Sequence, residues 1–421
     1  MSDILIIGAG AAGLYAARSL SSAGHSVRVL EARDRIGGRI FTSKDKSFTG
    51  PVEYGAEFIH GDLPLTQSLA KEAGVKLREG GGKSWTVDTG RIVEEDMFDQ
   101  HWSDMVYRLK RLKEDVPIAE FLQMYFSDKQ YDDLRESVTK FVEGFDAADA
   151  TKISSFALRD EWTSGDATKG YHLVGGYGQL IEFLKTQSER HGVTFHLSTI
   201  VSEIAWKKNE VTVTAFSGKK FTAEKLIITI PPAVLRTGIV KILPEPTQHL
   251  EALQKIETGS VVKFLIEFRE AEWENDNPHF RQFPEAHFIF SDAYVPTWWS
   301  QRPWPMPLLT GWLSGPVASS LNKPAEELLN DGIRSLGYIF DCNEEQLRSK
   351  IVAAKVINWG ADPFAGGAYA YKTVETPAAL EVLTQPIDNT IFFAGEAYYK
   401  GVEMGTVEAA FASAASVARQ W

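Results

Sequence analysis

The sequence contains one cysteine, Cys342, among its 421 residues. A lone thiol excludes an intrachain disulfide and a cysteine-based metal site, and it fits a reducing compartment. The sequence also has no zinc-ligand spacing, no serine nucleophile elbow and no kinase-type loop after its first glycines. We therefore expect no metal centre.

An apolar run long enough to cross a membrane is also missing. The longest stretch without charge, from Pro303 to Asn322, contains four prolines, which would break a spanning helix. No signal-peptide pattern precedes the first predicted strand, and no apolar tail follows the last predicted helix. We therefore expect a cytoplasmic protein that does not bind a membrane, as a monomer or homodimer.

Positive charge is scarce, because the net charge is −12. A basic footprint for nucleic acid is therefore absent. The acidity is compatible with a small cationic substrate, although solubility alone explains it equally well. Apolar residues make up 44% and charged residues 24%, as in globular proteins, and the length favours two closely associated domains.

The N-terminal residues have the pattern of a strand, a glycine-rich turn, a helix and a second strand. Asp3 to Ile7 is an apolar run, Leu14 to Ser22 has helical spacing, and Val27 to Leu30 is a second apolar run. Apolar runs of this kind are typical of parallel strands buried on both faces. The whole pattern occupies about 30 residues and predicts a βαβ unit.

The turn in this unit reads Gly8-Ala9-Gly10-Ala11-Ala12-Gly13. In such a turn the first glycine permits the tight bend, the second lets the backbone approach a pyrophosphate, and the third lets the helix pack on the strand. Glu31 ends the second strand, where a carboxylate accepts hydrogen bonds from ribose hydroxyls. Turn, flanking elements and acid together predict a dinucleotide-binding site.

The rest of the chain alternates between helical and strand-like regions. Met97 to Gln130 and Tyr131 to Phe145 have helical periodicity. Strand patterns return from Val193 to Ile230, from Ser260 to Phe268 and from Asn389 to Ala394, and a last helix begins near Thr406. Patterns typical of a dinucleotide-binding domain thus occur at both ends of the chain and partly in the middle, and no flexible linker separates the two halves. We infer that two domains interleave.

The predicted fold is α/β, and α+β over the whole chain. A GxGxxG Rossmann-like domain is predicted at 1–75, 190–258 and 385–421. A substrate domain of mixed sheet plus helices is predicted at 76–189 and 259–384.

A second motif, Arg35-Ile-Gly-Gly-Arg39, follows Glu31. Paired glycines permit close backbone approach, and Arg39 can neutralise a second phosphate. Here the sequence resembles the flavin-containing amine oxidase superfamily, which includes monoamine and polyamine oxidases, amino-acid oxidases and histone-lysine demethylases. The resemblance continues in order along nearly the whole chain, through the segments Gly55–Gly61, Leu173–Leu180, Leu226–Pro232, Gly259–Lys263, Ala365–Tyr369, Phe393–Glu396 and Gly405–Glu408.

This resemblance implies bound FAD as the cofactor. The residues expected to bind it are Gly8, Gly10, Ala11, Ala12, Gly13, Glu31, Ala32, Arg33, Gly38, Arg39, Gly55, Ala56, Glu57, Phe58, Val201, Trp359, Gly395, Glu396, Gly405, Thr406 and Val407. Monoamine oxidases of mammals carry a flavin-linked cysteine at the position of Ala368. Alanine cannot form that thioether, so we expect non-covalent FAD.

The resemblance also implies the catalytic residues, which are Lys263, Tyr369, Trp359 and His60. Lys263 matches a lysine that holds a water against flavin N5, and the alternative is an edge-strand lysine pointing to solvent. Tyr369 matches one wall of an aromatic cage for the amine, or is a core aromatic. His60 faces substrate, or is structural.

The second wall of the cage is missing from the motif. Alignment on Gly405 places Val402 at its position, so that Tyr398, Tyr399 or Trp312 is needed to replace it. This departure argues against monoamine oxidase specificity.

The function implied is oxidation of a C–N bond of a polyamine or other alkyl amine to an imine, with O2 reduced to H2O2. The alternatives are an L-amino-acid oxidase and another flavin dehydrogenase or desaturase of the same superfamily. An amino-acid oxidase needs an arginine for the substrate carboxylate, and Gly55-Ala56-Glu57-Phe58 contains none. A demethylase-like protein or a nicotinamide enzyme is a more distant alternative.

Overall fold

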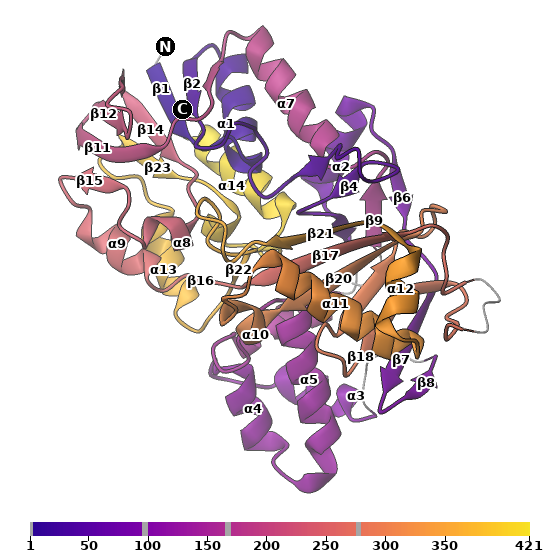
Figure 1. Cartoon of the computed structure of the whole chain (residues 1–421). Helices are drawn as coiled ribbons and strands as arrows, with labels where there is room; N and C mark the ends of the chain where they lie inside the picture. The colour runs from indigo at the N-terminus through magenta and orange to yellow at the C-terminus, as the bar shows by residue number, and fades with distance from the viewer. Residues whose placement is uncertain (1–2, 95–99, 165–169, 275–278) are drawn as a thin grey trace.

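A computed structural model describes residues 3–94, 100–164, 170–274 and 279–421 and shows a mixed α/β fold (Figure 1). Met97, where the first predicted helical region begins, lies outside these residues. No helix among the described residues combines the length and hydrophobicity needed to cross a bilayer.

A five-stranded parallel sheet is built from distant parts of the chain. Its spatial order is β10 (Thr194–His196), β2 (Ser26–Leu30), β1 (Asp3–Ile7), β14 (Lys225–Ile228) and β23 (Ile391–Phe393). Because all five strands are parallel, their carboxyl ends meet at one edge, where ligands bind in open α/β sheets. The strands fall within the three segments predicted for the dinucleotide-binding domain, and the domain bounds themselves stay a prediction.

Both faces of this sheet are covered, which explains the unbroken apolar runs. Ile4 and Ile6 pack in a core with three helices, while Leu5 and Ile7 pack in a second core on the other face. The helices are α1 (Ala11–Ser22), α7 (Gly178–Arg190) and α14 (Val407–Ala418). The opposite face is covered by a four-stranded sheet in the order β13 (Lys220–Ala223), β12 (Glu210–Ala215), β11 (Val201–Lys207) and β15 (Lys241–Leu243).

A mixed seven-stranded sheet forms the second half of the molecule. Its order is β21 (Ile351–Asn358), β17 (Val261–Phe268), β20 (Leu308–Ser314), β19 (Thr297–Ser300), β18 (Ala286–Ser291), β7 (Lys83–Asp88) and β8 (Arg91–Val93). β18 and β7 are parallel, and the other neighbouring pairs are antiparallel. Helices α10 (Gly315–Ser319), α11 (Ala325–Phe340) and α12 (Glu344–Lys350) lie on one side of it.

Strand β17 places Lys263 inside the molecule. Val262 and Phe264 pack beneath α11, and Leu265 faces the other side of the sheet. The side chain of Lys263 points to this second side, because successive residues of a strand alternate. β17 pairs with β20 on one side and β21 on the other, so Lys263 is not on an edge strand facing solvent.

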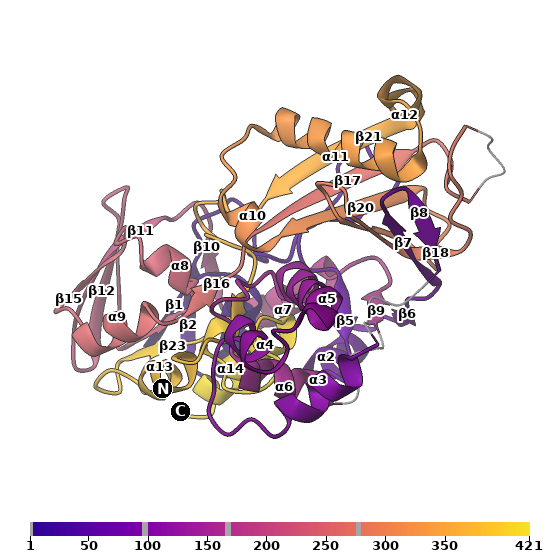
Figure 2. The same ribbon diagram turned by 90° about the horizontal axis from the view of Figure 1, so that it is seen from below.

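Four helices lie across the seven-stranded sheet from α11 and α12 (Figure 2). They are α3 (Trp102–Leu109), α4 (Ile118–Tyr125), α5 (Asp132–Gly144) and α6 (Ser155–Thr163). The helical region predicted to continue to Gln130 is interrupted between α3 and α4. Pro117 is the N-cap that immediately precedes α4, and proline fits the start of a helix because its missing N–H group would have no partner there.

Shorter elements connect these layers. They are β3 (Thr42–Ser43) paired with β4 (Val52–Glu53), the sheet of β5 (Phe58–His60), β9 (Gly170–Leu173) and β6 (Leu77–Glu79), β16 (Glu257–Thr258) paired with β22 (Ala370–Tyr371), the helices α2 (Pro64–Ala73), α8 (Pro232–Leu235), α9 (Thr247–Leu253) and α13 (Thr376–Leu383), and the 3-10 turns η1 (Lys129–Tyr131) and η2 (Glu396–Tyr398).

Candidate active site

One cavity of about 1200 Å³ connects the carboxyl edge of the parallel sheet with the inner side of the seven-stranded sheet. Every residue predicted for cofactor binding or catalysis lines it except Gly13. Residues separated by up to about 400 positions therefore meet at one site. The cavity is larger than the 300–1,000 Å³ typical of small-ligand pockets, so it has room for a dinucleotide and a substrate.

The glycine-rich turn leaves an open cradle at the start of α1. A Cβ atom on Gly10 would meet nothing closer than 4.0 Å, whereas one on Gly13 would lie 2.0 Å from the carbonyl oxygen of Gly8. Gly13 is therefore needed for packing the helix on β1, and this explains why it does not line the cavity. No side chain caps the helix at Gly10, so its free N–H groups can bind phosphate.

Glu31 holds the turn from the end of β2. Its carboxylate accepts hydrogen bonds from the backbone N–H groups of Ala9, at 2.7 Å, and Arg33, at 2.9 Å. The backbone N–H of Gly37 donates to the carbonyl of Ala9, which joins the second glycine motif to the first. These residues fit a dinucleotide, since a carboxylate and free N–H groups lie at the sheet edge where ribose and phosphates bind.

Two arginines predicted for cofactor binding are paired with acids. Arg33 forms a two-pronged ion pair with Asp362, with N–O distances of 2.9 and 2.6 Å. Arg39 contacts the Glu396 carboxylate at 2.8 Å and donates to the carbonyl of Ala368 at 2.6 Å. Arg39 thus joins the N-terminal and C-terminal flavin motifs.

The Lys263 ammonium lies against Glu57 in the buried wall of the cavity. The Nζ–Oε2 distance is 2.6 Å, and the two side chains are 1% and 5% exposed. Nζ also donates to the carbonyl of Gly55 at 3.1 Å. An ammonium has three donors, so one remains for a ligand in the cavity.

Glu57 is fixed by further donors. Trp299 Nε1 and Gln301 Nε2 donate to its Oε1 at 3.0 and 3.2 Å. Burial alone would raise the pKa of Glu57, but the Lys263 charge and these hydrogen bonds outweigh it and hold the pKa below the ordinary value. Glu57 is therefore a carboxylate near pH 7 and accepts a hydrogen bond from Lys263.

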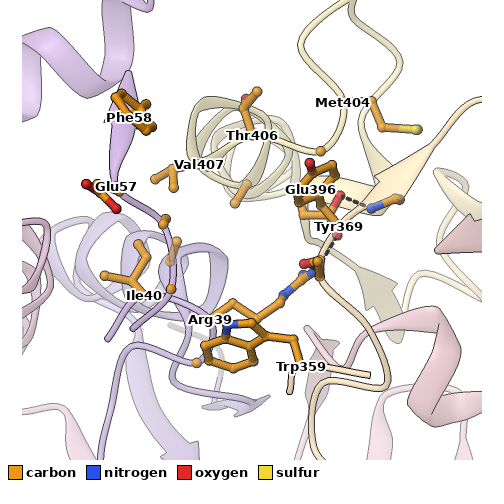
Figure 3. Close-up of a pocket in the computed structure, with 18 of the residues that line it drawn as sticks. Arg39, Ile40, Glu57, Phe58, Trp359, Tyr369, Glu396, Met404, Thr406 and Val407 are labelled. Atoms are coloured by element: carbon orange, nitrogen blue, oxygen red, sulfur yellow. Dashed lines mark hydrogen bonds and ion pairs between the residues drawn. The ribbon is translucent and has the colours of Figure 1, made fainter. Parts of the chain in front are cut away.

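The remaining walls combine aromatic and charged side chains. Figure 3 shows Glu57 and Phe58 on one side of the pocket, Tyr369 and Glu396 on another, and Arg39 with Trp359 on a third. Trp359 Nε1 donates to the carbonyl of Tyr54 at 3.0 Å, which fixes the indole. The Tyr369 hydroxyl donates to the carbonyl of Phe145.

The motif position of the second cage wall is occupied by Val402. Val402 lines the cavity and is 45% exposed. Of the three aromatics that could replace a second cage wall, Trp312 lines the cavity, and the other two do not. Tyr398 is buried and donates to the carbonyl of Ile230 at 3.0 Å.

His60 lies in an aromatic wall of the cavity. Its ring stacks on Phe58 with centroids 5.3 Å apart and meets the edge of Phe145 at 5.2 Å. Burial, with a smaller contribution from His172, lowers the pKa of His60 to about 4. The ring is therefore neutral near pH 7. His287, in the same cavity, has a pKa lowered to about 4, chiefly by burial.

Asp146 and Glu161 are acids of the cavity that sequence reasoning missed. Asp146 follows α5 and Glu161 belongs to α6, and both line the cavity near Tyr369. Neither lies in a recognised motif, and helical periodicity alone does not show that their helices meet.

Among the residues that the structure describes, no group of three or more His, Cys, Asp or Glu side chains could hold a metal.

Known proteins resemble this chain in sequence. A family model described as flavin containing amine oxidoreductase matches residues 11–420. Polyamine oxidase 2 of Arabidopsis thaliana is 27% identical over 94% of this chain and 83% of its own length. Lysine-specific histone demethylase 1B of Mus musculus is also 27% identical over 94% of this chain, which spans half the length of that relative.

Solved structures share the fold. A putrescine oxidase bound to putrescine superposes with a TM-score of 0.82 at 21% identity, covering 100% of this chain and 98% of that one. Cyclohexylamine oxidase from Brevibacterium oxydans gives a TM-score of 0.79 at 19% identity, covering 100% and 99%.

Proposed function

Because the chain belongs to the flavin-containing amine oxidoreductase family, we propose that it oxidises a C–N bond of a polyamine or other alkyl amine to the imine, with O2 reduced to H2O2. The observation that carries this proposal is the cavity that joins the glycine-rich turn to Lys263, Glu57 and Tyr369. Because this family contains flavin, membership also argues against the alternative of a nicotinamide-dependent enzyme.

FAD, when bound, accepts the two electrons taken from the substrate carbon. The residues that would hold it are the glycine turn, Glu31 and the segments around Gly55, Trp359, Gly395 and Gly405. Ala368 lines the cavity with a methyl group, which supports non-covalent binding.

Lys263 supplies a fixed positive charge and a hydrogen-bond donor to the reacting end of the cavity. Glu57 holds this ammonium in place through an ion pair of 2.6 Å. Lys263 is the proposed catalytic residue, and Glu57 is a positioning residue that acts through it.

Tyr369 and Trp312 provide aromatic surfaces for the amine, and aromatic faces attract cations. Neutral His60 does not repel the substrate's positive charge, and its ring can accept or donate a hydrogen bond. We propose that His60 and these aromatics position the amine.

An amino-acid substrate fits this cavity less well. Its carboxylate would need a cation, and three cations of the cavity are already paired: Lys263 with Glu57, Arg33 with Asp362, and Arg39 with Glu396. The ammonium of Lys372, which also lines the cavity, donates to the carbonyl of Gly401. The acids Asp146 and Glu161 also line the cavity and would repel a carboxylate. These charges favour an amine without a carboxyl group.

The proposal is tested by purifying the protein and measuring peroxide release from a panel of monoamines, diamines, polyamines and amino acids. We expect a yellow protein that releases peroxide with alkyl amines and not with amino acids. A yellow protein that oxidises amino acids alone, or no amine at all, would contradict the proposal.

A further inference from the structure

The loop between β21 and β22 forms a thin part of the cavity wall. Its residues 361–365, here called the flap, have the cavity on one side and solvent on the other. Pro363 and Phe364 line the cavity, whereas Ala361 and Pro363 are exposed. The flap therefore separates the cavity from solvent.

Glycines stand at both ends of the flap. Gly360 precedes it, and Gly366 and Gly367 follow it. The φ angles of Gly366 and Gly367 are +64° and +148°, in the region that glycine enters readily. Hinges consist of a few residues that absorb large changes of φ and ψ, and glycine permits such changes. The chain thus has hinge positions on both sides of the flap.

A two-pronged ion pair, here called the latch, holds the flap to the end of β2. Arg33 contacts both carboxylate oxygens of Asp362, at 2.9 and 2.6 Å, and its Cζ atom lies 5.3 Å from the centre of the Phe364 ring. The Arg33 and Asp362 side chains are 14% and 21% exposed, so salt screens this pair less than a surface pair. Two parallel N–H···O bonds also make it stronger and more directional than a single contact.

Arg33 is fixed to the parallel sheet, so the flap is the partner that can move. The backbone N–H of Arg33 donates to Glu31 at 2.9 Å, and its carbonyl accepts from the N–H of Ser198 at 2.8 Å. Apart from the latch, the hydrogen bonds of the flap to other described residues stay within 358–366. Breaking the latch therefore removes the hydrogen bonds that join the flap to β2.

We propose that the Arg33–Asp362 latch holds the flap over bound FAD and sets the rate at which FAD leaves the protein. This inference rests on the FAD of the proposed function and is independent of the amine. Asp362 does not line the cavity, so it acts through Arg33 and the flap and is a positioning residue. For FAD to leave through this wall, the latch must break and Phe364 must move away from the cavity.

The test follows the exchange of bound FAD for isotope-labelled FAD on the flavin-loaded protein, without any amine. Gel filtration at timed intervals removes free flavin, and mass spectrometry gives the labelled fraction. Asp362→Asn removes the charge and keeps the shape of the side chain. The matched control is Asp3→Asn, which removes an ion pair of 2.7 Å with Arg28, also on β2 but outside the cavity.

We expect FAD to exchange about tenfold faster or more in Asp362→Asn, about 1.4 kcal/mol of barrier. Asp3→Asn should keep the wild-type rate. Asp362→Glu restores the carboxylate and should exchange FAD more slowly than Asp362→Asn. The absorbance spectrum of the bound flavin should stay unchanged, and the unfolding temperature of the apoprotein should fall no further than in Asp3→Asn. A merely structural role of Asp362 would instead lower that temperature.

A double-mutant cycle with Arg33→Gln tests whether Asp362 acts through Arg33. Because this change already breaks the latch, adding Asp362→Asn should alter the exchange rate by less than about twofold. If Arg33→Gln does not retain flavin, Arg33→Lys replaces it, since lysine keeps the charge and lacks the second prong. Asp362→Asn should then accelerate exchange less than it does in the wild type.

Exchange at the wild-type rate in Asp362→Asn would overturn the latch, whether or not the protein oxidises amines. An equal acceleration in the presence and absence of the Arg33 change would also overturn it, because Asp362 would then act on something other than Arg33. A changed flavin spectrum would do the same, since it would show a direct effect on the bound flavin. Faster exchange that depends on Arg33, in a protein that oxidises no amine, would support the latch and contradict the proposed function instead.

Discussion

At the scale of single residues, Lys263 and Glu57 form a buried ion pair in the wall of the cavity. Replacing Lys263 by Met should slow amine oxidation at least tenfold, about 1.4 kcal/mol of barrier. It also strands a buried carboxylate, so the free energy of unfolding should fall by about 3–5 kcal/mol. The flavin-to-protein ratio should stay close to wild type. Steady-state kinetics, flavin absorbance and denaturant unfolding measure these three quantities.

The double variant Lys263→Met/Glu57→Gln is the matched control for stability, because it removes both charges. It should recover part of the lost stability without recovering the rate. Lys355→Met on the neighbouring strand β21 changes an exposed lysine and should affect neither. Wild-type rates in Lys263→Met would show that this lysine has no catalytic role.

His60 links stability to pH. Its pKa is lowered from 6.5 to about 4 by burial, so between these values the unfolded chain binds more protons than the folded one. Folding stability therefore falls as the pH falls from about 6.5 to about 4. His60→Gln should reduce the stability difference between pH 7.5 and pH 5.0, measured by urea unfolding. An identical difference in both proteins would mean that His60 titrates normally.

The sequence predicted which residues line the cavity better than it predicted what they touch. Motif position identified Lys263, but its partner Glu57 lies 206 positions away and meets it through the packing of β17. Arg39 was expected to face a phosphate, and its guanidinium contacts Glu396. Asp146 and Glu161 belong to no motif, and tertiary packing alone brings them together.

At the scale of elements, two glycines of the turn between β1 and α1 have different roles, because Gly10 leaves space for the cofactor and Gly13 is needed for packing. Gly10→Ala adds a methyl group to an open cradle, so the apoprotein should lose at most about 1 kcal/mol of stability. The same methyl group occupies the space in which a pyrophosphate approaches the backbone, so flavin occupancy after gel filtration should fall severalfold. Full occupancy would show that the cofactor does not approach Gly10.

Gly13→Ala is the contrasting change in the same turn. Its Cβ would lie 2.0 Å from the carbonyl oxygen of Gly8, which cannot move without opening the junction of β1 and α1. We expect low yield or loss of the folded protein, measured by circular dichroism. Normal folding of this variant would contradict the packing described here.

Periodicity predicted the presence of most elements and could not predict their neighbours. The runs at β1, β2, β14 and β23 were recognisable because strands buried on both faces are continuously apolar. Their spatial order depends on pairing between segments far apart, which no local pattern encodes. The break between α3 and α4 was missed because the apolar spacing continues on both sides of Pro117.

At the scale of the whole molecule, the flavin would contact segments from all parts of the chain. Acid precipitation should release all of it into the supernatant, because Ala368 offers no thiol. Excess FAD should raise the unfolding temperature of the apoprotein, since a ligand that binds the folded state alone stabilises it. Thermal scans with and without FAD measure this shift. Flavin that stays with the precipitate would contradict the non-covalent link.

The central place of β1 in the parallel sheet has a consequence for biosynthesis. β1 needs β14 beside it, and β14 in turn needs β23, which follows β1 by roughly 380 residues. A ribosome that adds about 5–20 residues per second takes roughly 20–80 s to deliver that last strand. Until then the nascent sheet has an unpaired edge that can pair with other chains. Flavin cannot protect this edge during translation, because the cavity also needs Gly395 to Val407, which follow β23 in the chain.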